Sequence, residues 1–169
     1  NTLSVNGGIN AEHFVLTGKT TIDPRFSLSW DINPNQSFSL GYGKHSQLED
    51  LSVYFFSAQV NGQKKYINQD LGFSHAHHVV LGYDCRINEH LRLKVEPYYQ
   101  YLYDVPGIAN TTFSMINYRQ DLAFQSELKN NSKGRNLGVD ITFERFLNDN
   151  FYYMVTTSLF NSKYKADDG

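Results

Sequence analysis

Several features that define common protein classes are scarce in this chain of 169 residues. Its single cysteine, Cys85, excludes an internal disulfide and with it the disulfide-stabilised secreted mini-domains. Basic residues are not in excess, because 15 Lys and Arg stand against 17 Asp and Glu, for a formal net charge of -2. The chain therefore has no basic field for nucleic acid, which we do not expect as a partner.

Long apolar runs are also missing. No uncharged apolar stretch approaches the roughly 20 residues that a membrane-spanning helix needs, and no segment keeps a helical period. The chain opens at Asn1 inside a patterned strand, without a starting Met, a basic segment or an apolar leader. We therefore expect a mature protein or a piece of a longer one.

Alternation of apolar and polar residues is the dominant pattern, and aromatic residues make up 15% of the chain. Over residues 25–43 the alternation continues on both sides of a turn at residues 33–36. Successive side chains of a strand point to opposite faces, so this stretch predicts a hairpin with one apolar and one polar face. The apolar face holds Phe26, Leu28, Trp30, Ile32, Phe38, Leu40 and Tyr42.

The same pattern predicts an all-β chain of about seven strands. The clearest alternation, over residues 91–104, is longer than the typical globular strand of about 5–6 residues and suits a tilted membrane strand of roughly 9–11. Pro97 argues against a regular central strand there, because proline cannot donate to the ladder. The predicted strands are residues 2–10, 25–32, 37–43, 78–87, 91–104, 136–146 and 151–164.

The predicted connectors differ in length between the two ends of the sheet. Long structureless loops are uncommon in compact domains unless they are functional. Tight turns at one end and large loops at the other are typical of outer-membrane barrels, with short periplasmic turns and long extracellular loops. The short turns are residues 33–36, 88–90 and 147–150, the medium connector is 13–23, and the long ones are 46–72 and 105–133.

Two quoted stretches point to a family. The first, IDPRFSLSWDINPNQSFSLGYGKHSQ, is followed later by HAHHVVLGYDCRINEHLRLKVEPYYQYLYDVP. They contain, in order, a Pro-Arg-hydrophobic-Ser strand, an Asn-rich turn, a Gly-Tyr-Gly strand and an H-x-x-x-G-Y strand. This order resembles the carboxy-terminal β-barrel of TonB-dependent outer-membrane receptors, especially those of Bacteroidetes, and the resemblance covers about residues 3–164.

The resemblance implies a fold, a location and a function. Receptors of this family are barrels of roughly 22 strands, filled by a plug and energised through the TonB complex, that import a scarce nutrient across the bacterial outer membrane. An iron chelate, a cobalamin or a glycan is the expected nutrient. Residues 1–169 would form a partial barrel of about seven strands without the plug, the TonB-contact segment or the terminal strand, that is, an antiparallel up-and-down meander.

The implied partners follow from that architecture. They are outer-membrane lipid, the remainder of the receptor barrel and its plug, a small-molecule or oligosaccharide ligand and, through the missing plug, the TonB complex. Residues on the lipid side would include Leu28, Trp30, Leu81 and Ile141.

A soluble lipocalin-like or β-sandwich ligand-binding protein is the alternative, in which the apolar face lines a core or a cavity. A hydrolase on a β scaffold is a third class. The two main interpretations differ in where the apolar stripe lies, because a membrane barrel turns it toward lipid and a soluble fold turns it inward. A dry, closed centre built from Leu28, Trp30, Leu81 and Ile141 would favour the soluble protein.

Candidate chemistry is sparse, and we predict no catalytic residue, metal site or cofactor. His75 and His77 share a strand face, but two imidazoles without a nearby Cys or carboxylate make a weak metal site. We expect them at a polar, partly lumenal strand end. Carboxylates on polar strand faces could form a glycosidase-like acid pair, but neighbouring Arg86, Arg92 and Lys94 favour lumenal charge ladders instead. These carboxylates are Asp84, Glu96, Asp140 and Glu144.

Tyrosines are the candidate ligand contacts. Some belong to the girdles where a ring meets both lipid and water, and others could stack on a sugar or another flat ligand. Binding residues are often displayed on loops of a rigid scaffold. We predict ligand contacts from the loops and the upper lumen at Tyr54, Tyr66, Tyr98 and Tyr118.

Overall fold

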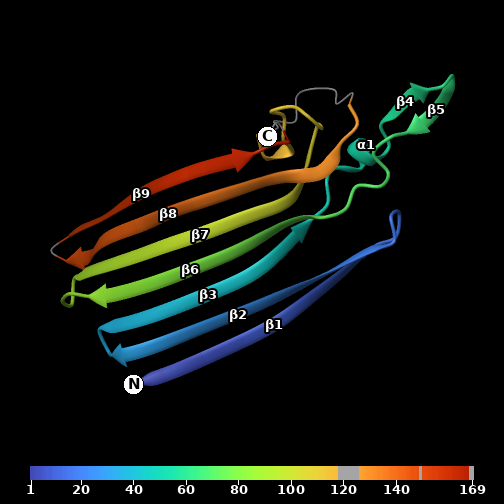
Figure 1. Cartoon of the computed structure of the whole chain (residues 1–169). Helices are drawn as coiled ribbons and strands as arrows, with labels where there is room; N and C mark the ends of the chain where they lie inside the picture. Colours follow the sequence, from blue (N-terminus) through green and yellow to red (C-terminus); the bar gives the residue numbers. More distant parts are fainter. Residues whose placement is uncertain (118–125, 149, 168–169) are drawn as a thin grey trace.

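The computed structural model describes residues 1–117, 126–148 and 150–167. Seven long strands form one antiparallel sheet in which each strand pairs with the next along the chain (Figure 1). The predicted all-β antiparallel meander is therefore confirmed. The strands are β1 (Thr2–Phe14), β2 (Lys19–Asn33), β3 (Gln36–Gln47), β6 (Ser74–Arg86), β7 (Leu91–Gly107), β8 (Lys129–Asn148) and β9 (Phe151–Lys165).

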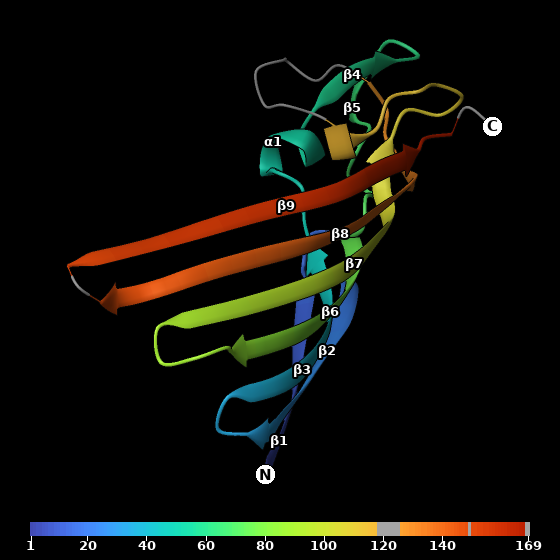
Figure 2. The ribbon, with the colours of Figure 1, turned by 90° about the vertical axis from the view of Figure 1, so that its left-hand side faces the viewer.

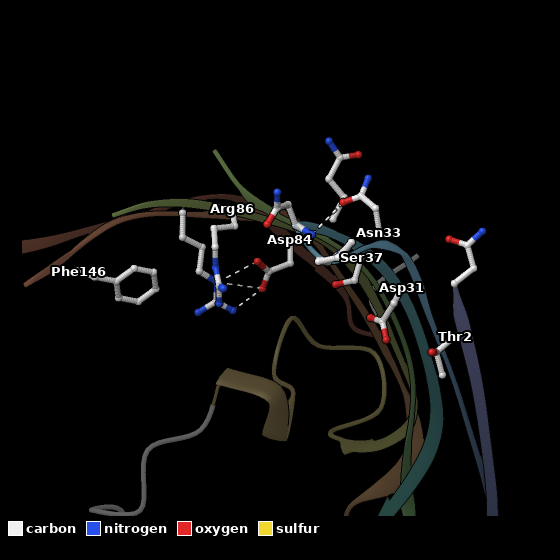
Figure 3. A pocket seen from close by; sticks show the side chains of 12 residues that line it. Thr2, Asp31, Asn33, Ser37, Asp84, Arg86 and Phe146 are labelled. Atoms are coloured by element: carbon white, nitrogen blue, oxygen red, sulfur yellow. Dashed lines mark hydrogen bonds and ion pairs between the residues drawn. The ribbon is translucent and has the colours of Figure 1, made fainter. Parts of the chain in front are cut away.

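The sheet is a single layer that curves strongly, so it has a concave and a convex face (Figure 2). Asp31, Ser37 and Asp84 point to the concave side (Figure 3), and the register places them directly opposite one another. Because side chains alternate along a strand, their chain neighbours Trp30 and Phe38, which also lie opposite each other, face the convex side.

The apolar residues of the convex face do not form a closed core. Trp30 is 44% exposed, Leu81 50%, Leu137 58% and Leu159 62%, because no second layer of described residues covers them. A β-sandwich would bury this face against another sheet, so the arrangement counts against that alternative. A wall that faces lipid needs this apolar outer surface.

The two ends of the sheet differ, as the connector lengths predict. Tight connections join β2 to β3, β6 to β7 and β8 to β9 at one end, which we call the turn end (Figure 1). The opposite end, the loop end, carries the two long connections. No helix among the described residues is long and apolar enough to cross a membrane.

The described parts of the long connections, residues 48–73, 108–117 and 126–128, are folded, whereas large loops were expected. The β3–β6 connection contains α1 (Leu51–Tyr54) and a hairpin of β4 (Ser57–Val60) and β5 (Gln63–Tyr66). The β7–β8 connection contains the 3-10 helix η1 (Met115–Asn117). These segments are ordered because apolar side chains from both connections bury one another. The buried cluster is Val53, Tyr54, Leu71 and Leu128, with Phe14, Leu48, Ile108, Phe113 and Met115 packed against it.

Buried Asn68 joins the two connections. Its side-chain nitrogen donates to the backbone oxygen of Ser126 at 3.2 Å, and its side-chain oxygen accepts from the backbone N–H of Leu128 at 2.9 Å. Phe14 at the end of β1 meets Tyr54 edge to face, with ring centroids 5.0 Å apart. The described parts of the two connections therefore form one small packed unit at the loop end.

Two sequence expectations about the strands were wrong, one about a connector and one about a proline. The medium connector at residues 13–23 is a tight turn, because β1 and β2 stay paired as far as Phe14 and Lys19. Pairing of β2 with β3 stops at Arg25, next to Pro24, which has no amide hydrogen to donate.

The second concerns Pro97, which lies inside the central strand β7. The structure accommodates it where the pairing of β6 with β7 is interrupted, between the partners Val80–Tyr98 and Tyr83–Val95. The amide hydrogen that Pro97 lacks is therefore not needed for pairing with β6, and the proline destabilises the sheet little.

Candidate functional site

The concave face is the candidate functional surface, because it gathers most of the hydrogen-bonding side chains of the sheet. It is assembled from alternate positions of all seven strands, so residues far apart in sequence share a row. At the turn end this face forms a hollow of about 630 Å³ (Figure 3). The hollow is lined by Asn1, Thr2, Asp31, Asn33, Pro34, Asn35, Gln36, Ser37, Asp84, Arg86, Arg92 and Phe146.

Arg92 is the centre of the charge network at this hollow. Its Nε donates to both carboxylate oxygens of Asp84, at 2.9 and 3.1 Å, and Nη2 contacts the same carboxylate. Nη1 reaches Glu144 of β8 at 3.5 Å. One guanidinium therefore links β6, β7 and β8, and both carboxylates stay paired as charges rather than forming an acid pair. The predicted charge ladder is present at these residues.

A second polar row crosses four strands nearer the loop end. Ser162 donates to Asn136 at 2.6 Å, Asn136 donates to Gln100 at 2.6 Å, and the Gln100 amide nitrogen donates to Nε2 of His78 at 2.7 Å. The bonds run in one direction, so each polarises the next. His45 extends the row, with its ring centroid 4.8 Å from that of His78. This row, His45–His78–Gln100–Asn136–Ser162, is the polar ladder.

Tyr98 lies flat on the concave wall beside this ladder. It pairs across the sheet with Gly138, where a Cβ would come within 2.5 Å of the tyrosine hydroxyl. Only glycine leaves room for the ring there. Phe160 of β9 is the next residue in the same row. Tyr98 and Phe160 line a shallow hollow of about 280 Å³ together with three members of the polar ladder, Gln100, Asn136 and Ser162.

The hollow combines aromatic rings with amide and hydroxyl groups. Aromatic faces pack against flat or ring-shaped ligands, and the polar groups can orient such a ligand. This part of the concave face therefore offers a binding surface for a small neutral molecule.

The four tyrosines predicted as ligand contacts lie in different settings. Tyr54 is 0% exposed within the loop-end cluster, and its hydroxyl accepts from the backbone N–H of Glu49 at 3.4 Å. Tyr66 is exposed on β5, edge to face with Phe55. Tyr98 lines the concave hollow. Tyr118 lies outside the described residues. The structure therefore places Tyr98 at a hollow and Tyr66 on an exposed hairpin.

Burial also changes two ionisable groups of the loop-end unit. Burial raises the pKa of the Glu49 carboxyl, and nearby Asp50 raises it further, while the hydrogen bond from Ser74 at 3.0 Å opposes the shift. Burial raises the pKa of Tyr54 as well. Protonation of Glu49 therefore favours the packed arrangement of this unit.

The expectation that His75 and His77 are partly lumenal is wrong. Both occupy convex-face positions, in register with Ser46 and Lys44 on the strand that also carries Tyr42. His77 accepts or donates a hydrogen bond at 2.9 Å to the Tyr42 hydroxyl, and both imidazoles stack on Tyr103. They belong to an aromatic belt near the loop end, because β6 keeps its alternation without a bulge. No group of three or more metal-ligating side chains occurs among the described residues.

Sequence reasoning missed the polar ladder and the pairing of Tyr98 with Gly138. Each member is an ordinary polar residue on its own strand, and only the register brings them to one height. The members of the ladder on β6, β7, β8 and β9 all have even residue numbers, and this pattern indicates that they share one face. The relative stagger of the strands was not available from alternation alone.

No protein-family model and no curated protein matches the chain. Solved structures do resemble it. The outer membrane transporter YddB from Escherichia coli matches with a TM-score of 0.74 and 19% identity, covering 96% of this chain and 23% of that chain. The FrpB iron transporter from Neisseria meningitidis (F3-3 variant) matches with a TM-score of 0.64 and 13% identity, covering 96% of this chain and 24% of that chain.

These matches concern the fold. The seven-stranded sheet is built like part of the β-barrel of outer-membrane transporters, and the chain spans about a quarter of the length of the structures it matches. The concave face corresponds to the inner surface of such a wall and the convex face to its outer surface.

Proposed function

We propose that this chain forms part of the wall of a TonB-dependent receptor that imports a scarce nutrient across the bacterial outer membrane. The observation that carries the proposal is the two-faced single-layer sheet, with an exposed apolar convex face and a hydrogen-bonded polar concave face. A membrane barrel with an aqueous interior requires this division. The role is structural and ligand-binding, without catalysis.

The remaining partners belong to the same proposal. β1 and β9 each pair with one strand of the sheet, and hydrocarbon does not tolerate unpaired strand edges. The rest of the barrel would pair with them, and a plug would fill the interior and contact the TonB complex. FrpB is an iron transporter, which keeps an iron chelate among the candidate nutrients beside a cobalamin and a glycan. A Bacteroidetes-like origin stays a prediction.

Within this receptor, we assign ligand contact to Tyr98 and to Tyr66. Tyr98 lines the concave hollow with hydrogen-bonding side chains, and Tyr66 is displayed from the loop-end hairpin. Tyr54 offers no surface in this conformation, so it would contact a ligand only after the loop-end unit opened. A ligand role for Tyr118 stays a prediction.

Uptake by cells that carry the full-length protein tests the proposal. Radioactive ferric chelate, labelled cobalamin and a labelled oligosaccharide serve as three probes. Loss of TonB should abolish uptake of one of them. Tyr98→Ala should lower the apparent affinity for that probe by about tenfold, because one aromatic contact contributes about 1–1.5 kcal/mol.

Tyr153→Ala provides the matched control, because Tyr153 lies on the convex face near the turn end. It should leave uptake unchanged at equal receptor abundance. Uptake of all three probes that did not depend on TonB would contradict the proposed function.

A further inference from the structure

The convex face carries a cluster of positive charge at the loop end of β8 and β9. Lys133 lies directly opposite Lys165, and Arg135 directly opposite Lys163. All four are exposed and share the face of Leu137. We call these four residues the basic patch.

The described residues of β8 and β9 supply no negative charge to the basic patch on its own face. Like charges placed directly opposite on neighbouring strands destabilise a sheet, yet this chain has two such pairs in succession. No Asp or Glu occupies a convex-face position of β8 or β9 in their described residues. None of the four cations forms an ion pair with a described residue. On the concave face, in contrast, the carboxylates of Asp84 and Glu144 are paired with Arg92.

The basic patch lies next to the apolar part of the convex face. Arg135 is two residues beyond Leu137, about 7 Å along the strand at roughly 3.4 Å per residue. Tyr101 lies opposite Arg135, and Tyr99 lies opposite Leu137. The four cations and both tyrosines line a hollow of about 340 Å³. The patch thus begins where the apolar surface ends.

We propose that the basic patch binds phosphate groups of lipid headgroups in the membrane leaflet at the loop end. The proposal rests on the proposed function, because only a membrane-embedded wall brings this face to a leaflet. A phosphate bridging opposite cations removes their repulsion, and Arg135 can donate two hydrogen bonds to it. Tyr99 and Tyr101 suit the boundary between acyl chains and headgroups, where amphipathic rings concentrate.

A lipid fits this surface better than a soluble anion does. The apolar residues directly below the patch, Leu137, Val139 and Leu159, would contact the acyl chains of the lipid whose phosphates the cations bind. A free phosphate would use only the cations. Cations next to a membrane surface contribute about 1 kcal/mol each toward anionic lipids, or about fivefold in affinity.

The test measures lipid retention by the full-length protein, purified in detergent, with native mass spectrometry. Lipid A with two phosphates is the probe, and monophosphorylated lipid A and neutral phosphatidylcholine are compared with it. The wild type should bind the bisphosphorylated lipid most tightly. Lys163→Gln with Lys165→Gln should weaken that binding by about 25-fold, which is fivefold for each of two cations.

Lys64→Gln with Lys65→Gln is the matched control, because it removes the same charge from the exposed hairpin strand β5. It should bind lipid A as the wild type does. Equal binding by the patch variant, or an equal loss in the control variant, would overturn the proposal. Displacement of lipid A by an equimolar amount of inorganic phosphate would overturn it as well, since the site would then be one for a free anion.

Two further readouts separate this proposal from the proposed function. Heat-modifiable gel mobility reports whether each variant has formed a folded barrel, so a folding failure is recognised. Release of the protein from membranes by alkaline carbonate would contradict a membrane-embedded wall. Retention in carbonate, combined with lipid binding unaffected by the patch substitutions, would contradict only the lipid site.

Discussion

Asn68 is a single side chain that joins the two long connections at the loop end. It is buried, and it holds the backbone of Ser126 and of Leu128. Without its amide both backbone groups lose a partner in a buried setting, which costs about 1–3 kcal/mol. We expect Asn68→Ala to speed hydrogen exchange in residues 46–73 and 126–128 of the folded protein.

Gln63→Ala on the exposed strand β5 is the comparison, since it removes an amide that lies at the surface. Its exchange pattern should match the wild type. Equal exchange in the Asn68→Ala protein would mean that the two connections are not joined through this residue.

Glu49 gives the loop end a pH dependence. Because burial raises the pKa of its carboxyl, the packed unit binds the proton more tightly than an opened one does. Stability from this group is therefore greatest below the ordinary Glu pKa and is lost as the pH rises through the raised pKa. Hydrogen exchange around α1, corrected for intrinsic rates, should show more opening at pH 7.5 than at pH 5.

Glu49→Gln removes the titration while keeping a hydrogen-bonding side chain beside Ser74. Opening in this variant should no longer vary between the two pH values. If the opening of Glu49→Gln kept the full pH dependence, that dependence would come from another group.

At the scale of the strands, the Arg92 network connects β6, β7 and β8. Arg92→Gln would leave Asp84 and Glu144, whose side chains are 28% and 27% exposed, without their cation. Because both remain partly solvated, we expect a loss of about 1–2 kcal/mol, less than for a fully buried pair. Urea unfolding of the folded protein in detergent measures it.

Lys94→Gln is the control for that change. Lys94 pairs with Glu96 of its own strand at 2.8 Å, and it lies opposite Asp84 of β6 without forming an ion pair with it. Lys94→Gln should lower the free energy of unfolding by less than Arg92→Gln does. An equal loss in both variants would show that the link between strands adds nothing.

The elements that sequence could predict are those fixed by alternation. Residues 25–32, 37–43 and 91–104 follow the alternation, and all three stretches lie in strands with the expected faces. The folded connections were not predictable, because Val53, Leu71 and Leu128 form a core only through contacts between distant segments. The candidate site was predicted in part: alternation placed Tyr98 on the concave face, but its glycine partner depends on strand register.

For the whole molecule, the proposed function depends on which face of the sheet meets water. The concave face carries paired charges and the polar ladder, and the convex face carries exposed apolar residues that end at the basic patch. A soluble protein would expose apolar surface of this extent only at a partner interface. Neighbouring positions on one strand must therefore meet different solvents.

Cysteine labelling of the full-length protein in native membranes measures this directly. In a Cys85→Ala background, single cysteines replace Ser158 on the concave face and Leu159 on the convex face of β9. We predict that a small charged methanethiosulfonate reagent labels position 158, whereas only a lipid-dissolved maleimide labels position 159. Labelling of position 159 by the charged reagent as fast as position 158 would contradict it.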